Sequence, residues 1–452
     1  MAASQIANLV EDLVGHDDNA DVTTDISNTN KVECAQDTGE KIKATVWAGK
    51  NKVEIVDMPK PRVIDPRDAV IKVTGSTICG SDLHLYHGVI PQLEKGDVLG
   101  HEFCGVVESI APGVTGCKVG DRVVASFPIA CGQCRNCQME LTSACERTNS
   151  NTITNAMYGK RTSGIFGYSH FTGGFAGGQA EYVRVPNADV NLLVLPEDVP
   201  DEKGLYLSDV LATAYHCVVD TGVKEGDTVA VWGAGPIGQM VVQFSLQQGA
   251  SRVILVDGGN GAWRLEFVRS KTPNVETLNF TDLSRRESVT SKLKGMASGG
   301  VDVALECAAG EYAKGWTHYL EMLSGAETDT SEILNEMITS VRPFGRIGVT
   351  GVYAGYTNHF NIGAIMQTGI RLIGNGQAPV QKYWKHLLEL IREQKINPLD
   401  MVTHVVQLTD MPKLYKLFEQ RSPGMQKVFV RTRHSFPPSQ EAPALIDLVN
   451  VV

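Results

Sequence analysis

Hydrophobic and polar residues alternate in two different ways along this chain. From residue 43 onward, short β-rich runs such as AVIKVTGSTICG and FCGVVESIA are separated by Gly, Pro and Asp turns. Beyond Asp209 the apolar runs alternate with helical stretches, as in DTVAVWGAGPIGQMVVQFSLQQGASRVILVD. Short strands between turns are typical of an antiparallel barrel, and strand–helix alternation is typical of a parallel sheet covered by helices. The pattern therefore predicts an α/β protein that contains two kinds of domain.

Composition and charge narrow the class of protein. The 452 residues are 42 % hydrophobic and 20 % charged, with a net charge of −10. The first forty residues hold nine acidic side chains against one lysine, so the remainder is nearly neutral. The acidic opening predicts a disordered tail, and a nearly neutral body argues against nucleic-acid binding. Because we find neither a targeting signal nor an apolar run of about 20 residues, we expect a cytoplasmic protein without a membrane partner.

Four cysteines lie close together in the spacing C-x2-C-x2-C-x7-C. They are Cys131, Cys134, Cys137 and Cys145. Ten cysteines in a chain of this length are too few for a disulfide scaffold. The spacing also differs from the common bacterial iron–sulfur pattern, which closes with x3 and a proline. We therefore favour a closed, structural zinc site over an iron–sulfur cluster or an unmetallated loop.

The segments TICGSDLHLYHG and LGHEFCGVV hold a second group of metal-binding residues. Cys79 and His101 are natural zinc donors. Asp82, three residues after Cys79, is well placed to accept the other ring N–H of His101 and so fix its tautomer. Glu102 is either another such outer carboxylate or an occasional ligand. These residues predict an open, catalytic metal site.

A hydroxyl and an imidazole follow Cys79 in the same segment. Ser81 and His84 are the residues that would carry a proton from the substrate oxygen to solvent. Each has an ordinary structural explanation when taken singly, just as an isolated cysteine is usually a small buried hydrophobe. Their clustering in two short segments is what favours catalysis.

The stretch VAVWGAGPIGQM carries the motif G-x-G-x-x-G between a strand and a helix. Gly233 allows the tight turn, Gly235 lets the backbone approach a pyrophosphate, and Gly238 lets helix and strand pack closely. The phosphates would lie at the helix N-terminus, beside Pro236 and Ile237, where free N–H groups favour anions. This motif predicts a dinucleotide-binding site.

The residues after the next strand indicate which dinucleotide binds. The strand VILVD ends in Asp257, at the distance expected for a carboxylate that accepts from the adenosine ribose. A carboxylate there repels a 2′-phosphate, so we expect NAD rather than NADP. Arg264 follows the long GGNGAW loop, and we expect it near the adenine pocket.

The motifs ICGSD, GHE, the four-cysteine segment, GDRV and G-x-G-x-x-G, in this order, resemble the zinc-dependent medium-chain dehydrogenase/reductase family of the alcohol dehydrogenase type. The resemblance covers about residues 43–432. It implies a GroES-like β-barrel catalytic domain that carries two zinc ions per subunit, and a doubly wound Rossmann domain for NAD. The expected segments are an acidic tail (1–40), the first part of the catalytic domain (41–210), the Rossmann domain (211–365), a return to the catalytic domain (366–434) and a C-terminal tail (435–452).

The third ligand of the catalytic zinc distinguishes branches of this family. Where alcohol dehydrogenases of this type have a cysteine, this chain has Asp209, in YLSDVLATAYHCV. A carboxylate is an acceptable zinc donor, and Cys217, His170 and Glu102 are the alternatives. With GGFAGGQAEYVRVP upstream, the segment resembles the glutathione-independent formaldehyde dehydrogenase and formaldehyde dismutase branch.

The resemblance implies hydride transfer between NAD and an alcohol or a hydrated aldehyde such as formaldehyde. That branch has an extra Rossmann loop that makes NAD slow to leave, and Gly315–Met337 is a matching excess here. Retained NAD would lead to aldehyde dismutation. The alternatives are an alcohol or polyol dehydrogenase for a larger substrate with exchangeable NAD, and a non-catalytic NAD-binding sensor or scaffold. The expected partners are a small-molecule substrate and further copies of the chain, in a homodimer or homotetramer.

Overall fold

The computed structural model describes residues 39–308, 329–353, 355–446 and 448. The chain divides into two compact units, one formed by Met1–Asp209 with Pro379–Val452 and the other by Val210–Ala378. The acidic tail expected over 1–40 lies almost wholly outside the described residues, as does most of the expected extra loop.

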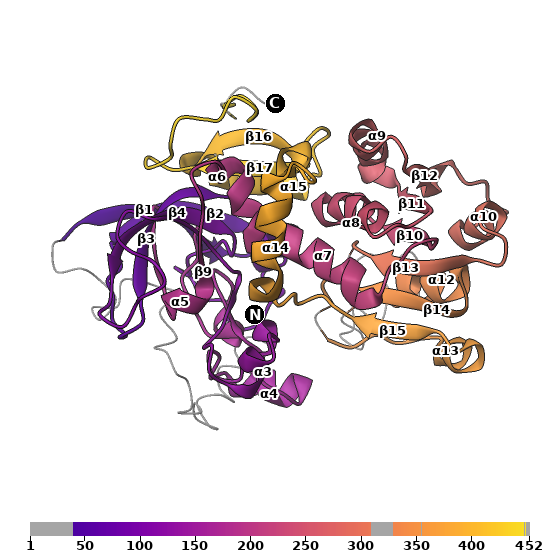
Figure 1. Cartoon of the computed structure of the whole chain (residues 1–452), viewed down its shortest axis with the longest axis horizontal. Helices are drawn as coiled ribbons and strands as arrows, with labels where there is room; N and C mark the ends of the chain where they lie inside the picture. Colours follow the sequence, from indigo (N-terminus) through magenta and orange to yellow (C-terminus); the bar gives the residue numbers. More distant parts are fainter. Residues whose placement is uncertain (1–38, 309–328, 354, 447, 449–452) are drawn as a thin grey trace. The chain divides into compact units, whose positions relative to one another are not determined.

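The first unit is built mainly of antiparallel β-structure (Figure 1). At its centre, β3 (Ala69–Ser76) pairs antiparallel with β4 (Phe103–Ile110), β8 (Tyr182–Val185) and β17 (Lys427–Arg431). Among the described residues, the order of this sheet is β16-β17-β3-β4-β5-β9, with β8 beside β3. The other strands of the unit are β1 (Lys41–Gly49), β2 (Lys52–Pro59), β5 (Arg122–Ala125), β6 (Pro128–Ile129), β7 (Gly164–Ile165), β9 (Leu192–Val194) and β16 (Val402–Gln407).

The helices of the first unit are mostly short and connect these strands. They are α2 (Gly80–Tyr86), α3 (Arg135–Gln138), α4 (Thr152–Tyr158), α5 (Ala188–Asn191), α6 (Asp201–Gly204), α14 (Val380–Arg392) and α15 (Met411–Glu419), with the 3₁₀ turns η2 (Thr142–Ala144), η3 (His170–Thr172), η4 (Leu205–Ser208), η7 (Pro398–Met401) and η8 (Leu408–Asp410). The longest of these, α14, is amphipathic, because Trp384, Leu387 and Ile391 recur at helical spacing on its buried face.

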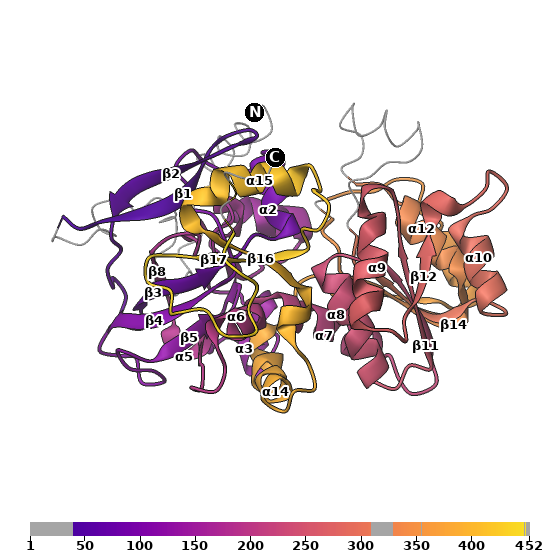
Figure 2. The same ribbon diagram turned by 90° about the horizontal axis from the view of Figure 1, so that it is seen from above.

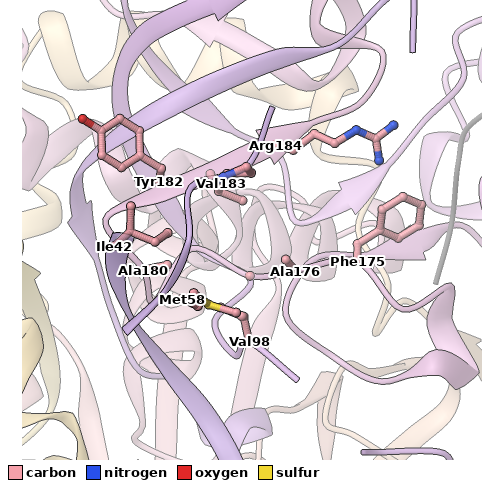
Figure 3. A pocket seen from close by; sticks show the side chains of 11 residues that line it. Ile42, Met58, Val98, Phe175, Ala176, Ala180, Tyr182, Val183 and Arg184 are labelled. Carbon is pink, nitrogen blue, oxygen red and sulfur yellow. The ribbon is translucent and has the colours of Figure 1, made fainter. Parts of the chain in front are cut away.

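The core of the barrel lies between its strands. Val73 and Val123 are fully buried there, and the rings of Phe103 and Phe166 meet edge to face at 5.1 Å. A small pocket beside this core is lined mainly by apolar side chains (Figure 3). Its one charged residue, Arg184, is already paired with Asp68 at 2.6 Å, so the pocket offers no chemistry of its own.

The second unit is a parallel sheet with helices packed against it (Figure 2). Among the described residues its strand order is β12-β11-β10-β13-β14-β15, which is the 3-2-1-4-5-6 order of doubly wound dinucleotide-binding sheets. The strands are β10 (Thr228–Trp232), β11 (Arg252–Asp257), β12 (Glu276–Asn279), β13 (Val301–Glu306), β14 (Val341–Val349) and β15 (Arg371–Gly374). The helices are α7 (Val210–Thr221), α8 (Pro236–Gln247), α9 (Ala262–Lys271), α10 (Val289–Met296), α12 (Glu332–Ser340) and α13 (Ile362–Thr368), with the 3₁₀ turns η5 (Gly259–Gly261) and η6 (Phe280–Asp282).

The structure differs from the sequence analysis at one domain boundary, the end of the second unit. We expected the chain to return to the catalytic domain at residue 366, but β15 is hydrogen-bonded in parallel to β14 and so completes the second sheet. The return therefore begins at Pro379, just before α14.

The described part of the expected C-terminal tail lies against the first unit. Leu445 forms a bridge with Val405 of β16, and the backbone N–H of Ser439 donates to Glu202 at 3.1 Å. Among the described residues, none of the helices has both the length and the apolar character needed to cross a bilayer.

Candidate functional site

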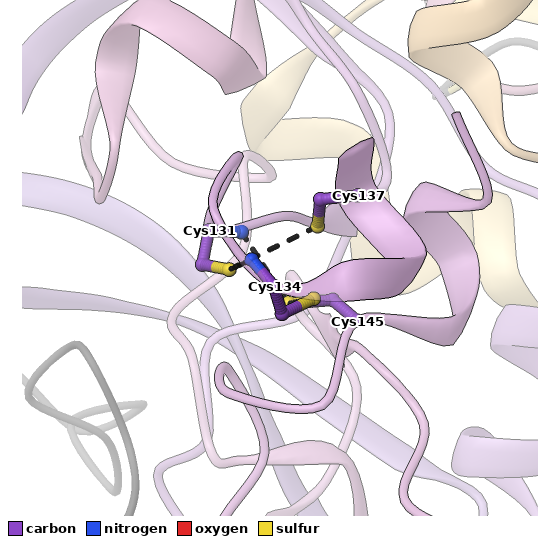
Figure 4. A group of neighbouring side chains, drawn as sticks. All are labelled: Cys131, Cys134, Cys137 and Cys145. Carbon is purple, nitrogen blue, oxygen red and sulfur yellow. Dashed lines mark hydrogen bonds between the residues drawn. The ribbon is translucent and has the colours of Figure 1, made fainter. Parts of the chain in front are cut away.

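The four closely spaced cysteines meet in one buried cluster (Figure 4). Their sulfur atoms all lie within 4.8 Å of one another. The Cys131–Cys137 and Cys134–Cys145 sulfur distances are 3.9 and 4.0 Å. A tetrahedral ion with Zn–S bonds of about 2.3 Å sets sulfurs about 3.8 Å apart, whereas a disulfide requires about 2.05 Å. The geometry therefore fits a four-thiolate zinc site, and all four thiols are unbridged.

Local backbone geometry produces this cluster. Gly132 adopts a φ of +75°, which turns the chain back over Cys131. The backbone N–H groups of Gln133 and Cys134 then donate to the Cys131 sulfur at 3.4 and 3.3 Å. The neighbouring thiols of Cys137 and Cys145, aided by these N–H groups, lower the pKa of Cys131 and favour its thiolate. Because four protein donors leave no position for a substrate, an ion held by this cluster would have a structural role.

The second group of donors assembles within the first unit from three separate segments. Cys79 is the residue before α2, His101 and Glu102 precede β4, and Asp209 follows η4. Each offers one donor atom, and these atoms all lie within 4.8 Å of one another. The structure thus brings together the cysteine, histidine and aspartate that the sequence indicated, together with Glu102.

Asp82 lies on the far side of the His101 ring from Asp209. Its Oδ1 is 3.4 Å from Nδ1 of His101, and its Oδ2 accepts from the backbone N–H of Cys79 at 2.8 Å. The side-chain amide of Gln179 also approaches Oδ2, at 3.4 Å. Asp82 therefore accepts from Cys79 and faces Nδ1 of His101, the ring nitrogen that the sequence analysis expected it to fix.

The other ring nitrogen of His101 faces the metal-binding group. Its Nε2 lies 3.4 Å from Oδ2 of Asp209. Burial lowers the pKa of His101, but the charge of Asp82 and the contacts with Asp209 and Cys79 outweigh it, so this pKa is raised well above its usual value. The site is thus built to hold positive charge. A divalent cation held by a thiolate, an imidazole and a carboxylate satisfies this demand, so the donor set fits zinc.

Glu102 is engaged by a residue that the sequence analysis did not identify. Lys427, on β17, places its Nζ 2.5 Å from Oε1 of Glu102. Burial lowers the pKa of Lys427, but Glu102 and Cys79 outweigh this effect and raise it. No signal near Glu102 could have identified Lys427, because 325 positions separate the two residues in the sequence.

The proposed proton carriers, Ser81 and His84, both lie on α2, where His84 is buried. A second residue that the sequence analysis missed, Tyr168, lies beside them. Its hydroxyl is hydrogen-bonded to Ser81, and its ring meets the His101 ring edge to face at 6.1 Å. Phe127 meets the same ring at 6.3 Å. Tyr168 lies in the segment GYSHFTGG, directly upstream of GGFAGGQAEYVRVP, and this position was the only feature of the sequence that could have indicated a role at the site.

Of the three alternative third ligands, Glu102 joins the group, whereas His170 and Cys217 do not. Among the described residues, the metal-binding cluster around Cys79 contains neither His170 nor Cys217. The Nδ1 of His170 lies 3.5 Å from Oδ2 of Asp97, and Cys217 is buried in α7 of the second unit.

The glycine motif lies between β10 and α8 in the second unit. Gly233 has a φ of +99°, and a Cβ at Gly238 would lie 1.8 Å from the carbonyl oxygen of Gly233. A Cβ at Gly235 would meet nothing within 4 Å, so the backbone there borders open space. Pro236 and Ile237 form the first turn of α8. This arrangement fits a phosphate group placed against the helix N-terminus.

Asp257 ends β11 and is tied to the same loop. Its Oδ2 accepts from the backbone N–H of Ala234 and its Oδ1 from that of Gly258, both at 2.7 Å. Arg264 lies in the first turn of α9, with its guanidinium 5.6 Å from the centre of the Trp263 ring. The carboxylate thus lies beside the glycine motif, where a ribose would need it.

Comparison with known proteins agrees with this geometry. Residues 65–197 match the model of the alcohol dehydrogenase GroES-like domain. The chain is 38 % identical over 395 residues to a zinc-type alcohol dehydrogenase-like protein of Schizosaccharomyces pombe, covering 87 % of this chain and 91 % of that one. This chain belongs to the zinc-type alcohol dehydrogenase family.

Other proteins are also similar to this chain over most of its length. A glutathione-independent formaldehyde dehydrogenase of Pseudomonas aeruginosa is 33 % identical, over 87 % of this chain and 98 % of its own. The solved structure of an alcohol dehydrogenase from Thermus sp. ATN1 is 31 % identical and superposes with a TM-score of 0.72, covering 86 % of this chain and all of its own. The family agrees with the zinc and NAD predicted from the sequence, and with a small-molecule substrate.

Proposed function

We propose that this zinc-type alcohol dehydrogenase transfers hydride between NAD and a small hydrated aldehyde or alcohol, with formaldehyde as the first substrate to test. The observation that carries the proposal is the meeting of Cys79, His101 and Asp209 within one group of donor atoms. Its similarity to a formaldehyde dehydrogenase and to a formaldehyde dismutase of Pseudomonas putida, which is 31 % identical, supports the substrate class.

In this proposal Cys79, His101 and Asp209 hold the catalytic zinc, and Asp82 fixes the tautomer of His101. Zinc, when bound, supplies a Lewis acid that polarises the substrate oxygen and lowers its pKa. Ser81 would accept the hydroxyl proton of the substrate while it gives up its own proton toward His84, which passes it on to solvent. The thiolate and the carboxylate together balance the two charges of the ion.

The second unit would supply the hydride acceptor. Gly233, Gly235 and Gly238 would hold the pyrophosphate of NAD, and Asp257 would accept from its adenosine ribose. NAD, when bound, takes up the hydride. Arg264 is proposed to border the adenine. The two aromatic rings beside His101, those of Phe127 and Tyr168, favour a small substrate.

Turnover of purified enzyme tests this function. We expect two zinc ions per chain and oxidation of formaldehyde that exceeds oxidation of larger alcohols and polyols. Cys79→Ser should abolish turnover while nucleotide binding persists. A chain that binds NAD and turns over none of these substrates would instead be a sensor or scaffold, and a preference for larger alcohols would indicate the polyol-type dehydrogenase.

A second measurement separates dehydrogenation from dismutation. If NAD stays bound between turnovers, the NADH formed reduces a second aldehyde, and formate and methanol appear in equal amounts without added NAD. We expect NAD in the supernatant of heat-denatured protein. An empty supernatant, with turnover that depends on added NAD, would favour simple dehydrogenation.

We also propose that the enzyme is a homo-oligomer joined through the β15 edge of its second sheet. Among the described residues β15 pairs only with β14, and an unpaired strand edge is a template for pairing with another chain. Near this edge Phe344, Ile362 and Met366 are exposed by 79, 63 and 74 %. Light scattering of purified protein should give a mass of two or four chains, and Met366→Lys should reduce it.

A further inference from the structure

The ion pair between Lys427 and Glu102 is buried on all sides. The side chains are 2 % and 1 % exposed, and Nζ lies 2.5 Å from Oε1 of Glu102. Apart from Glu102, Nζ approaches the carbonyl oxygen of Ile78 at 3.3 Å and the centre of the Tyr206 ring at 5.9 Å. A buried ammonium is costly unless it is paired, and an apolar side chain would fill this position of β17 more cheaply. A buried lysine at this position is therefore best explained by a function of its ion pair with Glu102.

Glu102 has the means to reach the metal-binding group. Its Oε1 lies 4.0 Å from Nε2 of His101, and one of its oxygens lies within 4.8 Å of the donor atoms of Cys79 and Asp209. Its Oε2 is buried and, in the described part of the chain, has no hydrogen-bond partner. A carboxylate this close to the donor atoms, with Oε1 paired to Lys427 and Oε2 without a hydrogen bond, is a natural fourth ligand for zinc.

A fourth protein ligand would close the site. A catalytic zinc site needs three protein ligands and one open position, whereas four ligands make a structural site. Three anionic donors, those of Cys79, Asp209 and Glu102, would also exceed the charge of a divalent ion by one. Lys427 provides the single positive charge that balances this excess, and it does so on the Glu102 carboxylate.

We propose that Lys427 is a positioning residue that holds Glu102 off the catalytic metal and so keeps the fourth coordination position open for substrate. The proposal rests on the proposed function, since it assumes zinc between Cys79, His101 and Asp209. Without Lys427, the Glu102 carboxylate would be left buried beside a divalent ion with no other cation to pair with. It would then bind the ion and exclude the substrate.

Zinc release tests this role directly, without any substrate. The rate is followed with the chromogenic chelator 4-(2-pyridylazo)resorcinol, and the kinetic phase that is missing in Cys79→Ser belongs to the catalytic site. In Lys427→Met we expect this phase to be about tenfold slower or more, since the site gains a ligand, while turnover falls by a similar factor. The matched control Lys427→Arg keeps the positive charge and should release zinc like the wild type.

The double variant Lys427→Met with Glu102→Gln shows whether Lys427 acts by holding Glu102 off the metal or has a purely structural role. An amide is a much poorer zinc ligand than a carboxylate, so release should return to within about threefold of the wild-type rate. If Lys427→Met does not fold, Lys427→Gln takes its place, because it can still donate to the carbonyl of Ile78. A wild-type release rate in the single variant, or slow release that Glu102→Gln does not reverse, would overturn the proposal.

The release assay also separates this proposal from the proposed function. A protein that turns over no alcohol or aldehyde, but whose zinc release follows the expected pattern, would contradict only the function. If Lys427→Met oxidises formaldehyde as fast as the wild type, only the proposed role of Lys427 is contradicted.

Discussion

The Nε2 atom of His101 lies 3.4 Å from Oδ2 of Asp209, although the two residues come from different segments of the first unit. This contact places a carboxylate where alcohol dehydrogenases of this type are expected to have a thiolate. A carboxylate is a harder donor than a thiolate, and it still contributes one negative charge to the site. The catalytic zinc is therefore expected to depend on Asp209 as much as on Cys79.

Removing the charge of Asp209 should empty the catalytic site alone. In Asp209→Asn we expect zinc to fall from two ions to about one per chain, with turnover reduced by about a hundredfold or more. The remaining ion belongs to the four-cysteine cluster. Metal analysis after dialysis measures this, and Asp282→Asn, an exposed position, is the control. Two ions in Asp209→Asn would show that another residue is the third ligand.

Loss of a cluster thiol should affect stability rather than chemistry. Cys137→Ser leaves three thiolates around the structural zinc, and metal binding contributes directly to the folding of such a segment. We expect a melting temperature lower by several degrees and sensitivity to EDTA. Cys79→Ser provides the contrast, because it should lose turnover with little change in melting temperature. Equal melting curves for Cys137→Ser and the wild type would contradict a structural role.

The Tyr168 hydroxyl should matter through Ser81. Tyr168→Phe keeps the ring that packs on His101 but removes the partner of the Ser81 hydroxyl. One neutral hydrogen bond is worth about 0.5–1.5 kcal/mol, so we expect kcat to fall by about three- to tenfold with KM little changed. Tyr158→Phe, at an exposed tyrosine, should leave kcat as it is. A kcat equal to that of the wild type in Tyr168→Phe would show that Ser81 acts without this bond.

Asp257 should control which dinucleotide binds. Asp257→Asn removes the negative charge that repels a 2′-phosphate and weakens the acceptor for Ala234 and Gly258. We expect the Kd for NAD to rise by about tenfold and the preference for NAD over NADP to shrink. Calorimetric titration of both dinucleotides measures the two effects. An unchanged ratio of the two affinities would place the ribose elsewhere.

Acidification should destabilise the first unit through His434. Burial and the nearby charges of Arg433 and Lys72 lower the pKa of His434 to about 4, and its ring packs edge to face on Tyr182 at 4.9 Å. An unfolded histidine titrates near pH 6.5, so unfolding takes up a proton between about pH 6.5 and pH 4. Stability from this residue is thus present above pH 6.5 and is lost as the pH falls.

The variant His434→Gln isolates this effect. Because His434 is partly exposed, solvent reduces its contribution to the order of 1 kcal/mol. The free energy of unfolding is measured in urea at pH 7 and pH 5. Its decrease from pH 7 to pH 5 should be smaller in His434→Gln than in the wild type, by about 1 kcal/mol. Identical losses in both proteins would mean that other groups carry the acid sensitivity.

Local sequence patterns predicted the parts of the sites that are local in the fold. The four cysteines lie within one short segment, so their spacing alone indicated a zinc site. Cys79 and Asp82 lie in one turn of chain, where the backbone N–H of Cys79 donates to the Asp82 carboxylate. The glycine motif was equally local, because a single strand–turn–helix unit contains it.

Residues that reach the site through tertiary packing could not be predicted in this way. Lys427 meets Glu102 only because β17 pairs with β3 in the assembled sheet. Tyr168 contacts Ser81 across a long separation, and the sequence has no periodicity that links the two. The boundary at Pro379 was missed for a similar reason, since the short strand β15 is recognised only by its partner β14.

The pairing of β3 with β17 also constrains how the molecule is made. The ribosome completes Val210–Ala378 as one continuous stretch before it begins the last strands of the first unit. A nascent chain can therefore fold the nucleotide-binding unit before Val430, the strand partner of Ser76, has been synthesised. A stop codon just before β17 would remove Lys427 together with every later residue, and it would leave the central strand β3 without one neighbour.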